Sequence, residues 1–363
     1  MGTFENDYGV CGMNEKIWEQ LDLTQINAFV EKMTEQKAYK IEDIAKELAN
    51  GNMNGALEMM WSAFLEVFLP GIRESKSMLV GILMLGMLSM FLHYTFGVVK
   101  SRQVADLANY FVYLLLILLL LHNFELIFST AGEMLSICKQ FIASLVPAYC
   151  LSVSFANGAA GAAAYYEFVL LLFAGIDYIL AGLLLPLTQS YVFLVVMDGL
   201  DEKHRMKEFV KLTERLISWG IRICLTAVVV ISGVQNAITS QIDGVQKTVF
   251  QKAVGAVPGI GDMSESVTEL LLGSAGLIKN SIGGAAMVLL FLVILRPMCK
   301  VFFVALTMKV AGACVRVMGQ NSLSETISKI GEGGILVMRI VMCAAIAVCI
   351  SIAMTMLVVK GGG

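Results

Sequence analysis

Few side chains in this sequence could do chemistry, and their spacing matches no catalytic or metal-binding pattern. His93 and His122 lie in apolar runs without a partner at catalytic or ligand spacing. The sequence has no His-Glu-x-x-His motif, no Gly-x-Ser-x-Gly motif and no Walker loop. Gly273-Ser-Ala-Gly supplies a serine, but no general base accompanies it. We therefore expect a protein that is not an enzyme and that needs no cofactor.

The cysteines are spread along the chain and contain no Cys-x-x-Cys pair, so neither a zinc site nor a redox motif is predicted. The eight positions are Cys11, Cys138, Cys150, Cys224, Cys299, Cys314, Cys343 and Cys349. All except Cys11 lie in or beside apolar runs, where a free cysteine behaves as a small hydrophobic side chain. We expect packing roles for them.

Ionisable residues inside apolar runs are more informative, because a charge at membrane depth is costly and usually faces a bundle interior or a wet cavity. Asp177 and Arg296 lie well inside such runs. Each could belong to an intramembrane polar pathway, or could lie nearer an interface than hydropathy indicates. Glu167, Arg222 and Arg339 lie near the ends of their runs, and we favour the interfacial position for them.

Composition indicates that a helical bundle in lipid positions these residues. The 363 residues are 57% hydrophobic and 15% charged, and the mean hydropathy is +0.76. These values are typical of polytopic membrane proteins. The net charge is only −3 at pH 7, and the basic residues form no patch with interleaved aromatic residues. Nucleic-acid binding is therefore not expected.

The apolar runs predict an all-α polytopic membrane protein with about seven spans. Six runs are long enough to cross about 30 Å of hydrocarbon: residues 78–99, 105–128, 165–185, 216–234, 284–310 and 335–359. Residues 134–152 could be a further, tilted or partial span, or could lie against the bundle, since Lys139 and Gln140 interrupt them and Pro147 bends them. Pro186 is expected to divide off a shorter limb, residues 187–199.

The polar residues 1–77 are predicted to form an acidic, helical extracytoplasmic region ahead of a membrane domain at residues 78–363. Apolar positions repeat at helical spacing in two short segments, residues 23–33 and 41–48. Residues 54–69 are more apolar. They fit either a helix in the membrane interface or a core helix of a small soluble domain.

Lysine and arginine placement orients the chain, because short cytoplasmic loops are enriched in both. The strongest signal is residues 201–215, which contain Lys203, Arg205, Lys207, Lys211 and Arg215. We predict that this segment and residues 100–102 face the cytoplasm. Residues 1–77 and 237–280 are then extracytoplasmic, and residues 237–257 have the pattern of an amphipathic helix.

A polar, glycine-rich segment, residues 257–283, lies between apolar runs and is our candidate docking or gating motif. Its proline and glycines predict a bend, and an Asp-x-x-Glu pair then has the spacing of a capping box. A short amphipathic helix should follow and end near residues 279–280. The motif residues are Pro258, Gly259, Gly261, Asp262, Glu265, Glu269, Lys279 and Asn280. The alternative is a loop that merely joins two spans.

This motif resembles the signature of the stage III sporulation protein AE family of endospore-forming bacteria. The resemblance rests on Val257-Pro-Gly-Ile-Gly-Asp-Met, Ser266-Val-Thr-Glu and Leu277-Ile-Lys-Asn-Ser-Ile-Gly. Similar segments elsewhere are Leu21-Asp-Leu-Thr-Gln-Ile-Asn-Ala-Phe29, Phe111-Val-Tyr-Leu-Leu-Leu-Ile, Val146-Pro-Ala-Tyr and the alanine and glycine run at residues 158–164. Together they cover most of the chain from about residue 21 onward.

The resemblance implies a subunit of the channel or secretion-like complex that the stage III AA to AH proteins form between mother cell and forespore. It implies a multi-pass protein of the mother-cell membrane around the forespore, in contact with the other stage III proteins and, through them, with the forespore-side partner. A homo-oligomer is compatible with it. Relatives carry a secretory signal, but residues 1–50 contain no apolar h-region. We expect that signal to lie upstream or to be missing from this sequence.

Two other function classes stay open. A permease for a small solute would need a midplane site formed by broken helices, and Pro186 and Arg296-Pro297 are weak pointers to one. An intramembrane hydrolase would need a nucleophile and a base that the sequence does not supply. The subunit count, the transported species and the adjoining subunit do not follow from the sequence.

Overall fold

The computed structural model describes residues 24–34, 41–49, 53–98, 102–157, 159–201, 205–255 and 261–357. Every element within these ranges is helical, which confirms the all-α prediction. The elements are α2 (Thr24–Thr34), α3 (Ile41–Ala49), α4 (Met53–Val98), α5 (Arg102–Asn157), α6 (Ala159–Ile179), the π-helix η1 (Leu180–Leu184), α7 (Leu185–Leu200), α8 (Lys207–Gly255), α9 (Gly261–Val317) and α10 (Asn321–Leu357).

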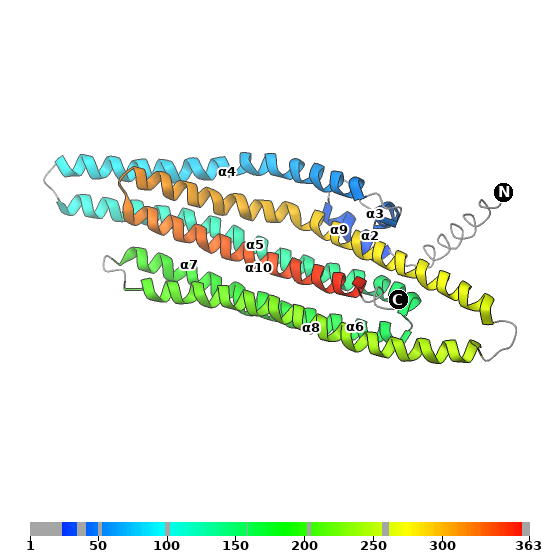
Figure 1. Cartoon of the computed structure of the whole chain (residues 1–363). Coiled ribbons are helices and arrows are strands. Elements are labelled where there is room, and N and C mark those ends of the chain that lie inside the picture. The colour runs from blue at the N-terminus through cyan, green and yellow to red at the C-terminus, as the bar shows by residue number, and fades with distance from the viewer. Residues whose placement is uncertain are drawn as a thin grey trace.

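The long helices lie side by side as an antiparallel bundle (Figure 1). α9 and α10 form the most extensive pair, and α10 also contacts α5, α7 and α8. The C-terminal ends of α4, α7 and α9 lie at the left end of the bundle in Figure 1, together with the N-terminal ends of α5, α8 and α10. The helix order therefore brings the connections α4–α5, α7–α8 and α9–α10 to one end of the molecule.

Five helical stretches are long and apolar enough to cross a membrane, which confirms the polytopic prediction. They are Tyr110–Pro147, Val169–Leu200, Lys207–Val234, Asn280–Val317 and Asn321–Ala353, and Lys76–Leu92 is a shorter apolar helix. The expectation was about seven spans, and the difference arises in α4 and α5. The expected span at residues 78–99 corresponds only to the shorter apolar helix Lys76–Leu92. Residues 105–128 and 134–152 belong to one helix that contains Pro147, and the short polar segment at residues 129–133 between the two apolar runs stays helical.

The long helices exceed the thickness of a bilayer. α9 has 57 residues and α8 has 49, so at a rise of 1.5 Å per residue α9 is about 85 Å long, against about 30 Å of hydrocarbon. The predicted amphipathic helix at residues 237–257 is the second half of α8, which ends at Gly255. The paired ends of α8 and α9 project beyond the neighbouring helices at the right of Figure 1.

Pro186 widens its helix without breaking it, contrary to the expected division at that position. Proline lacks a backbone N–H and its ring crowds the preceding turn. The helix accommodates it through η1, where the Leu185 N–H donates to the Leu180 carbonyl across five residues. α6, η1 and α7 therefore follow one another without interruption from Ala159 to Leu200.

The two N-terminal helices pack against the bundle. α2 contacts α5 and α3 contacts α9; the Phe29 ring lies 6.2 Å from that of Phe141. The Ile41 N–H donates to Asn27 Oδ1 at 3.1 Å, which satisfies a backbone donor at the start of α3. The predicted boundary between residues 77 and 78 falls within the continuous helix α4. The division into an extracytoplasmic region and a membrane domain stays a prediction.

Candidate functional site: a charged cluster where α7 meets α10

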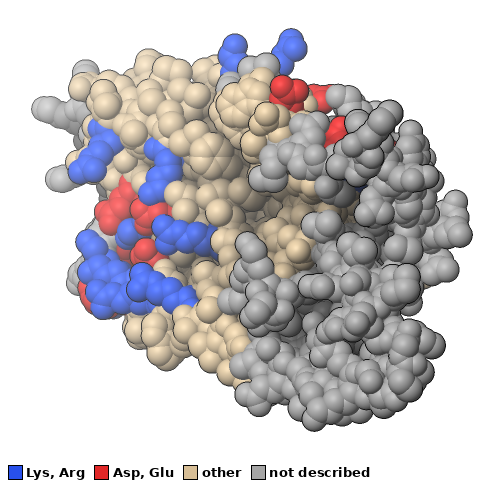
Figure 2. Space-filling model, turned by 45° about the vertical axis from the view of Figure 1, so that its right-hand side comes forward, with Lys and Arg blue, Asp and Glu red and all other residues tan. Residues whose placement is uncertain are grey.

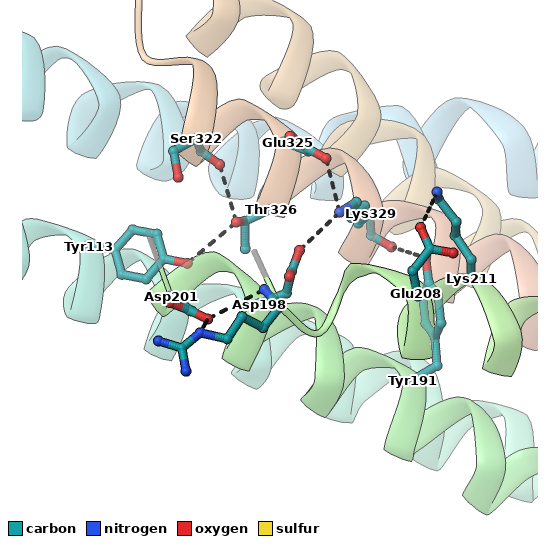
Figure 3. Close-up of polar contacts among 11 residues, drawn as sticks. Tyr113, Tyr191, Asp198, Asp201, Glu208, Lys211, Ser322, Glu325, Thr326 and Lys329 are labelled. Atoms are coloured by element: carbon teal, nitrogen blue, oxygen red, sulfur yellow. Dashed lines mark hydrogen bonds and ion pairs between the residues drawn. The ribbon is translucent and has the colours of Figure 1, made fainter. Parts of the chain in front are cut away.

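The charged cluster lies at the end of α7, against the first half of α10 (Figure 3). Lys329 of α10 is its centre, with Nζ 3.4 Å from Oδ2 of Asp198 and 3.0 Å from Oε1 of Glu325. The Asp198 side chain is 2% exposed and the Lys329 side chain is 18% exposed. Both charges are therefore largely removed from water. A single buried charge would be strongly unfavourable, so each of the two requires the other as its partner.

A second ion pair joins α9 to the same part of α10. Lys309 Nζ lies 2.6 Å from Glu332 Oε1, the distance of a charge-assisted hydrogen bond. These side chains are 30% and 40% exposed, so water screens this pair more than the Lys329–Asp198 pair. α10 thus forms ion pairs with both α7 and α9 from residues that lie within one helical turn of each other.

Hydroxyl groups extend the cluster to α5 (Figure 3). Thr326 donates to the Ser322 carbonyl at 3.2 Å, and Tyr113 Oη lies 3.4 Å from Thr326 Oγ1. A threonine hydroxyl has a single proton, so Tyr113 is the donor in the second contact. Tyr191 of α7 donates to the Lys329 carbonyl at 3.3 Å. Side chains from α5 and α7 therefore hold the helix turn that presents Lys329.

Glycines permit the close approach of these helices. A Cβ atom at Gly199 would overlap the hydroxyl groups of Tyr113 and Thr326. A Cβ atom at Gly312 of α9 would lie 3.2 Å from the Ser324 carbonyl oxygen of α10, and Ser324 Oγ donates to the Gly312 carbonyl at 2.8 Å. Small residues at these two positions thus let α7 and α9 lie against α10.

Exposed charges surround the cluster on the α8 side. Lys211 pairs with Glu208 at 2.7 Å and Arg205 with Asp201 at 3.4 Å, and such exposed pairs contribute little to stability. In Figure 2 the charged side chains of the visible face gather mainly on its left, and a broad uncharged surface separates them from a smaller group at the top.

The cluster can fix helix positions. Its lysines face carboxylates, and its tyrosine and threonine hydroxyl groups bind groups on neighbouring helices or on their own helix. Within the described residues, no group of three or more His, Cys, Asp or Glu side chains could hold a metal ion. The chemistry of the cluster is that of an electrostatic clamp.

The two predicted intramembrane residues lie on different helices. Asp177 of α6 forms an ion pair with Lys139 of α5 at 3.0 Å, with the side chains 28% and 65% exposed, respectively. Arg296 is exposed on α9, next to Pro297, which α9 contains without a break. The structure thus gives Asp177 a partner on a neighbouring helix that its sequence position did not indicate.

The predicted docking or gating motif is only partly described. Pro258 and Gly259 lie outside the described residues, Gly261 begins α9, and Asp262, Glu265, Glu269 and Lys279 follow along that helix. Asn280 is half-buried, and its Oδ1 is buried without a hydrogen-bond partner. The expected helix end near residues 279–280 was wrong, because α9 continues to Val317. Gly283 and Gly284 follow Ile282 but do not end α9, because the helix is packed against α10 and α3 at this point.

Sequence reasoning missed Asp198, Lys309, Lys329 and Glu332. One signal was available, the i,i+4 spacing of Glu325 and Lys329 in a polar run before the last apolar segment. The Asp198–Lys329 contact joins residues 131 positions apart. No local pattern predicts a contact at that separation.

Comparisons with known proteins agree on one family. A family model described as stage III sporulation protein AE matches residues 39–359. A relative described as stage III sporulation protein AE, from Bacillus subtilis (strain 168), is 20% identical over 316 residues, which cover 87% of this chain and 79% of the relative. No solved structure matches the chain.

Proposed function

The chain belongs to the stage III sporulation protein AE family, and from this premise we propose that it is an integral membrane subunit of a channel or secretion-like complex between mother cell and forespore. The observation that carries the proposal is the extent of the match. Residues 39–359 include all the helices from α4 to α10, so the similarity covers the whole membrane bundle. A sporulation role is therefore assigned to the bundle as a unit.

The proposed location is the mother-cell membrane around the forespore, with the other stage III sporulation proteins as neighbours. The projecting ends of α8 and α9 support a contact role on the extracytoplasmic side (Figure 1). Residues 235–255 of α8 lie beyond the apolar stretch that ends at Val234, and 21 helical residues extend about 30 Å. The described residues of the docking or gating motif, from Gly261 to Asn280, lie along the first part of α9, on the same projection.

The permease alternative has less support than the sequence indicated. Its two pointers were Pro186 and Pro297, each expected to break a helix near the midplane. Instead, η1 carries the helix through Pro186, and Pro297 lies inside the continuous α9. Uptake of a labelled solute into vesicles that contain this chain alone would favour the permease over the complex subunit.

The proposal is tested by removing the chain from its endospore-forming host. We expect forespores to stop developing after engulfment, and the full-length chain, supplied in the mother cell, to restore development. A copy made only in the forespore should not restore it, because the complex needs this subunit in the mother-cell membrane. Normal spore formation without the chain would overturn the proposal.

A further inference from the structure

α5 carries a row of polar side chains on the outer surface of the bundle. Its members, which we call the α5 stripe, are His122, Glu125, Ser129, Glu133, Ser136, Lys139 and Gln140, and all are exposed. Their spacing of mostly three or four residues places them along one face of the helix. The opposite face is buried, with Phe124, Ile127, Met134 and Phe141 at most 4% exposed. The stripe therefore faces away from the bundle core.

Contacts with α10 place the stripe level with the last apolar span. Phe124 and Ile127 of α5 lie against Gly333 and Gly334 of α10, within 3.4 Å of the position that a Cβ atom would occupy there. Gly334 directly precedes the run from Ile335 to Ala353, which contains one charged residue, Arg339. The start of the stripe is thus level with the start of the last apolar span.

The other end of the stripe is level with the far part of the same span. Ile142 and Leu145, just past the stripe, line one small cavity together with Val348 and Ile352 of α10. The stripe therefore runs beside the apolar part of α10 over most of its length. Where the apolar part of α10 crosses the hydrocarbon, the polar groups of the stripe lie at the same depth.

Contacts within and beside the stripe show that its groups form a polar surface. Lys139 reaches across to Asp177 of α6 at 3.0 Å while its side chain stays 65% exposed, and Gln140 Nε2 donates to Ser136 Oγ at 3.0 Å. An ion pair this exposed would be costly in lipid. Many outward side chains elsewhere in the bundle are apolar, for example Leu183 at 58% and Val230 at 57% exposed, while Arg222, Arg296 and Arg339 are exposed charges on α8, α9 and α10.

We propose that the α5 stripe faces water inside the membrane, as one wall of an aqueous path that further copies of this chain close. The inference rests on the proposed function, because a single copy would present the stripe to lipid, whereas copies in a complex can turn it inward. Glu125 and Glu133 give the wall negative charge, and Lys139 is offset by Asp177. Rings of acidic side chains favour cations over anions, so the path should admit small cations more readily than anions.

Cysteine accessibility in the assembled complex tests this inference. Ser129→Cys and Ser136→Cys are small changes at exposed positions. Leu183→Cys is the matched control, because α6 and α7 run antiparallel to α5 (Figure 1) and the Lys139–Asp177 contact sets the register, which places Leu183 level with Glu133. Each chain is made in sporulating cells, and isolated membranes are treated with a cationic, membrane-impermeant methanethiosulfonate. The labelling of each variant is measured as the increase over the labelling of the parent chain.

We expect Ser129→Cys and Ser136→Cys to react at least about tenfold faster than Leu183→Cys, since the reactive thiolate forms only where water reaches the sulfur. The anionic analogue of the reagent should react more slowly than the cationic one. Unreactive cysteines at both stripe positions would overturn the inference and indicate that another protein surface covers the stripe. Equal reactivity at Leu183 would also overturn it.

The same strains separate this inference from the proposed function. Ser129→Cys and Ser136→Cys should support forespore development, which shows that each variant folds and assembles. If development is normal and the stripe cysteines are unreactive, the aqueous path is wrong and the complex subunit stands. If cells without the chain sporulate normally, the proposed function fails whatever the labelling.

Discussion

At the scale of residues, the Lys329–Asp198 pair matters because it is nearly removed from water. Among the described residues, replacing Asp198 with asparagine leaves Glu325, an exposed carboxylate, as the remaining acidic partner of Lys329. Breaking a buried pair in this way typically costs about 3–5 kcal/mol. We predict that Asp198→Asn clearly lowers the midpoint of thermal unfolding of the purified chain in detergent.

Glu208→Gln is the matched control for that change, because it removes a carboxylate from the exposed Lys211 pair. Its midpoint should stay at the parent value. Asp198→Asn combined with Lys329→Met should recover part of the loss, since the pair is then removed as a whole. If Asp198→Asn and Glu208→Gln shift the midpoint equally, the clamp does not stabilise the bundle.

The same residues mark the limit of sequence reasoning. Asp177 could be singled out because one acid in a long apolar run is conspicuous. Its partner Lys139 had been taken only as an interruption of a span, and Asp198 lies beside a polar loop where acids are ordinary. Which charge meets which depends on how the helices pack, and helix packing is a tertiary property that local spacing does not encode.

At the scale of elements, apolar runs predicted where helices cross the membrane but not where helices end. Hydropathy reports burial in lipid, and a helix that continues into water keeps its backbone hydrogen bonds without changing that signal. The two apolar runs of α5 therefore appeared as separate segments, and α8 and α9 appeared shorter than they are. Proline was also a poor guide, because η1 absorbs Pro186 within a continuous helix.

The docking or gating motif yields a prediction at this scale. Glu265→Gln with Glu269→Gln leaves α9 helical and removes only charge, so we expect weaker assembly of the complex and fewer developing forespores at unchanged membrane abundance. Gly259→Val with Gly261→Val would strain any backbone with positive φ at the bend, so we expect a larger loss. Forespore counts and recovery of the complex measure both effects. If both pairs behave as the parent chain, the segment is only a connector.

At the scale of the whole molecule, the helix directions agree with the orientation predicted from lysine and arginine. The α4–α5 and α7–α8 connections lie at the same end of the bundle (Figure 1), as the predicted cytoplasmic position of both requires. We predict that Lys207→Cys, with Cys11 removed, does not react with an impermeant thiol reagent in intact cells and reacts after permeabilisation. Labelling in intact cells would reverse the topology.

The claim that this chain is a subunit of a sporulation complex is tested most directly by isolating its neighbours. An affinity-tagged chain, shown to support sporulation, is cross-linked in cells during engulfment and purified from their membranes, with a tagged unrelated multi-pass protein as the control. We predict that other stage III sporulation proteins are recovered with this chain and not with the control. Recovery of the functional chain without any of them would contradict the account.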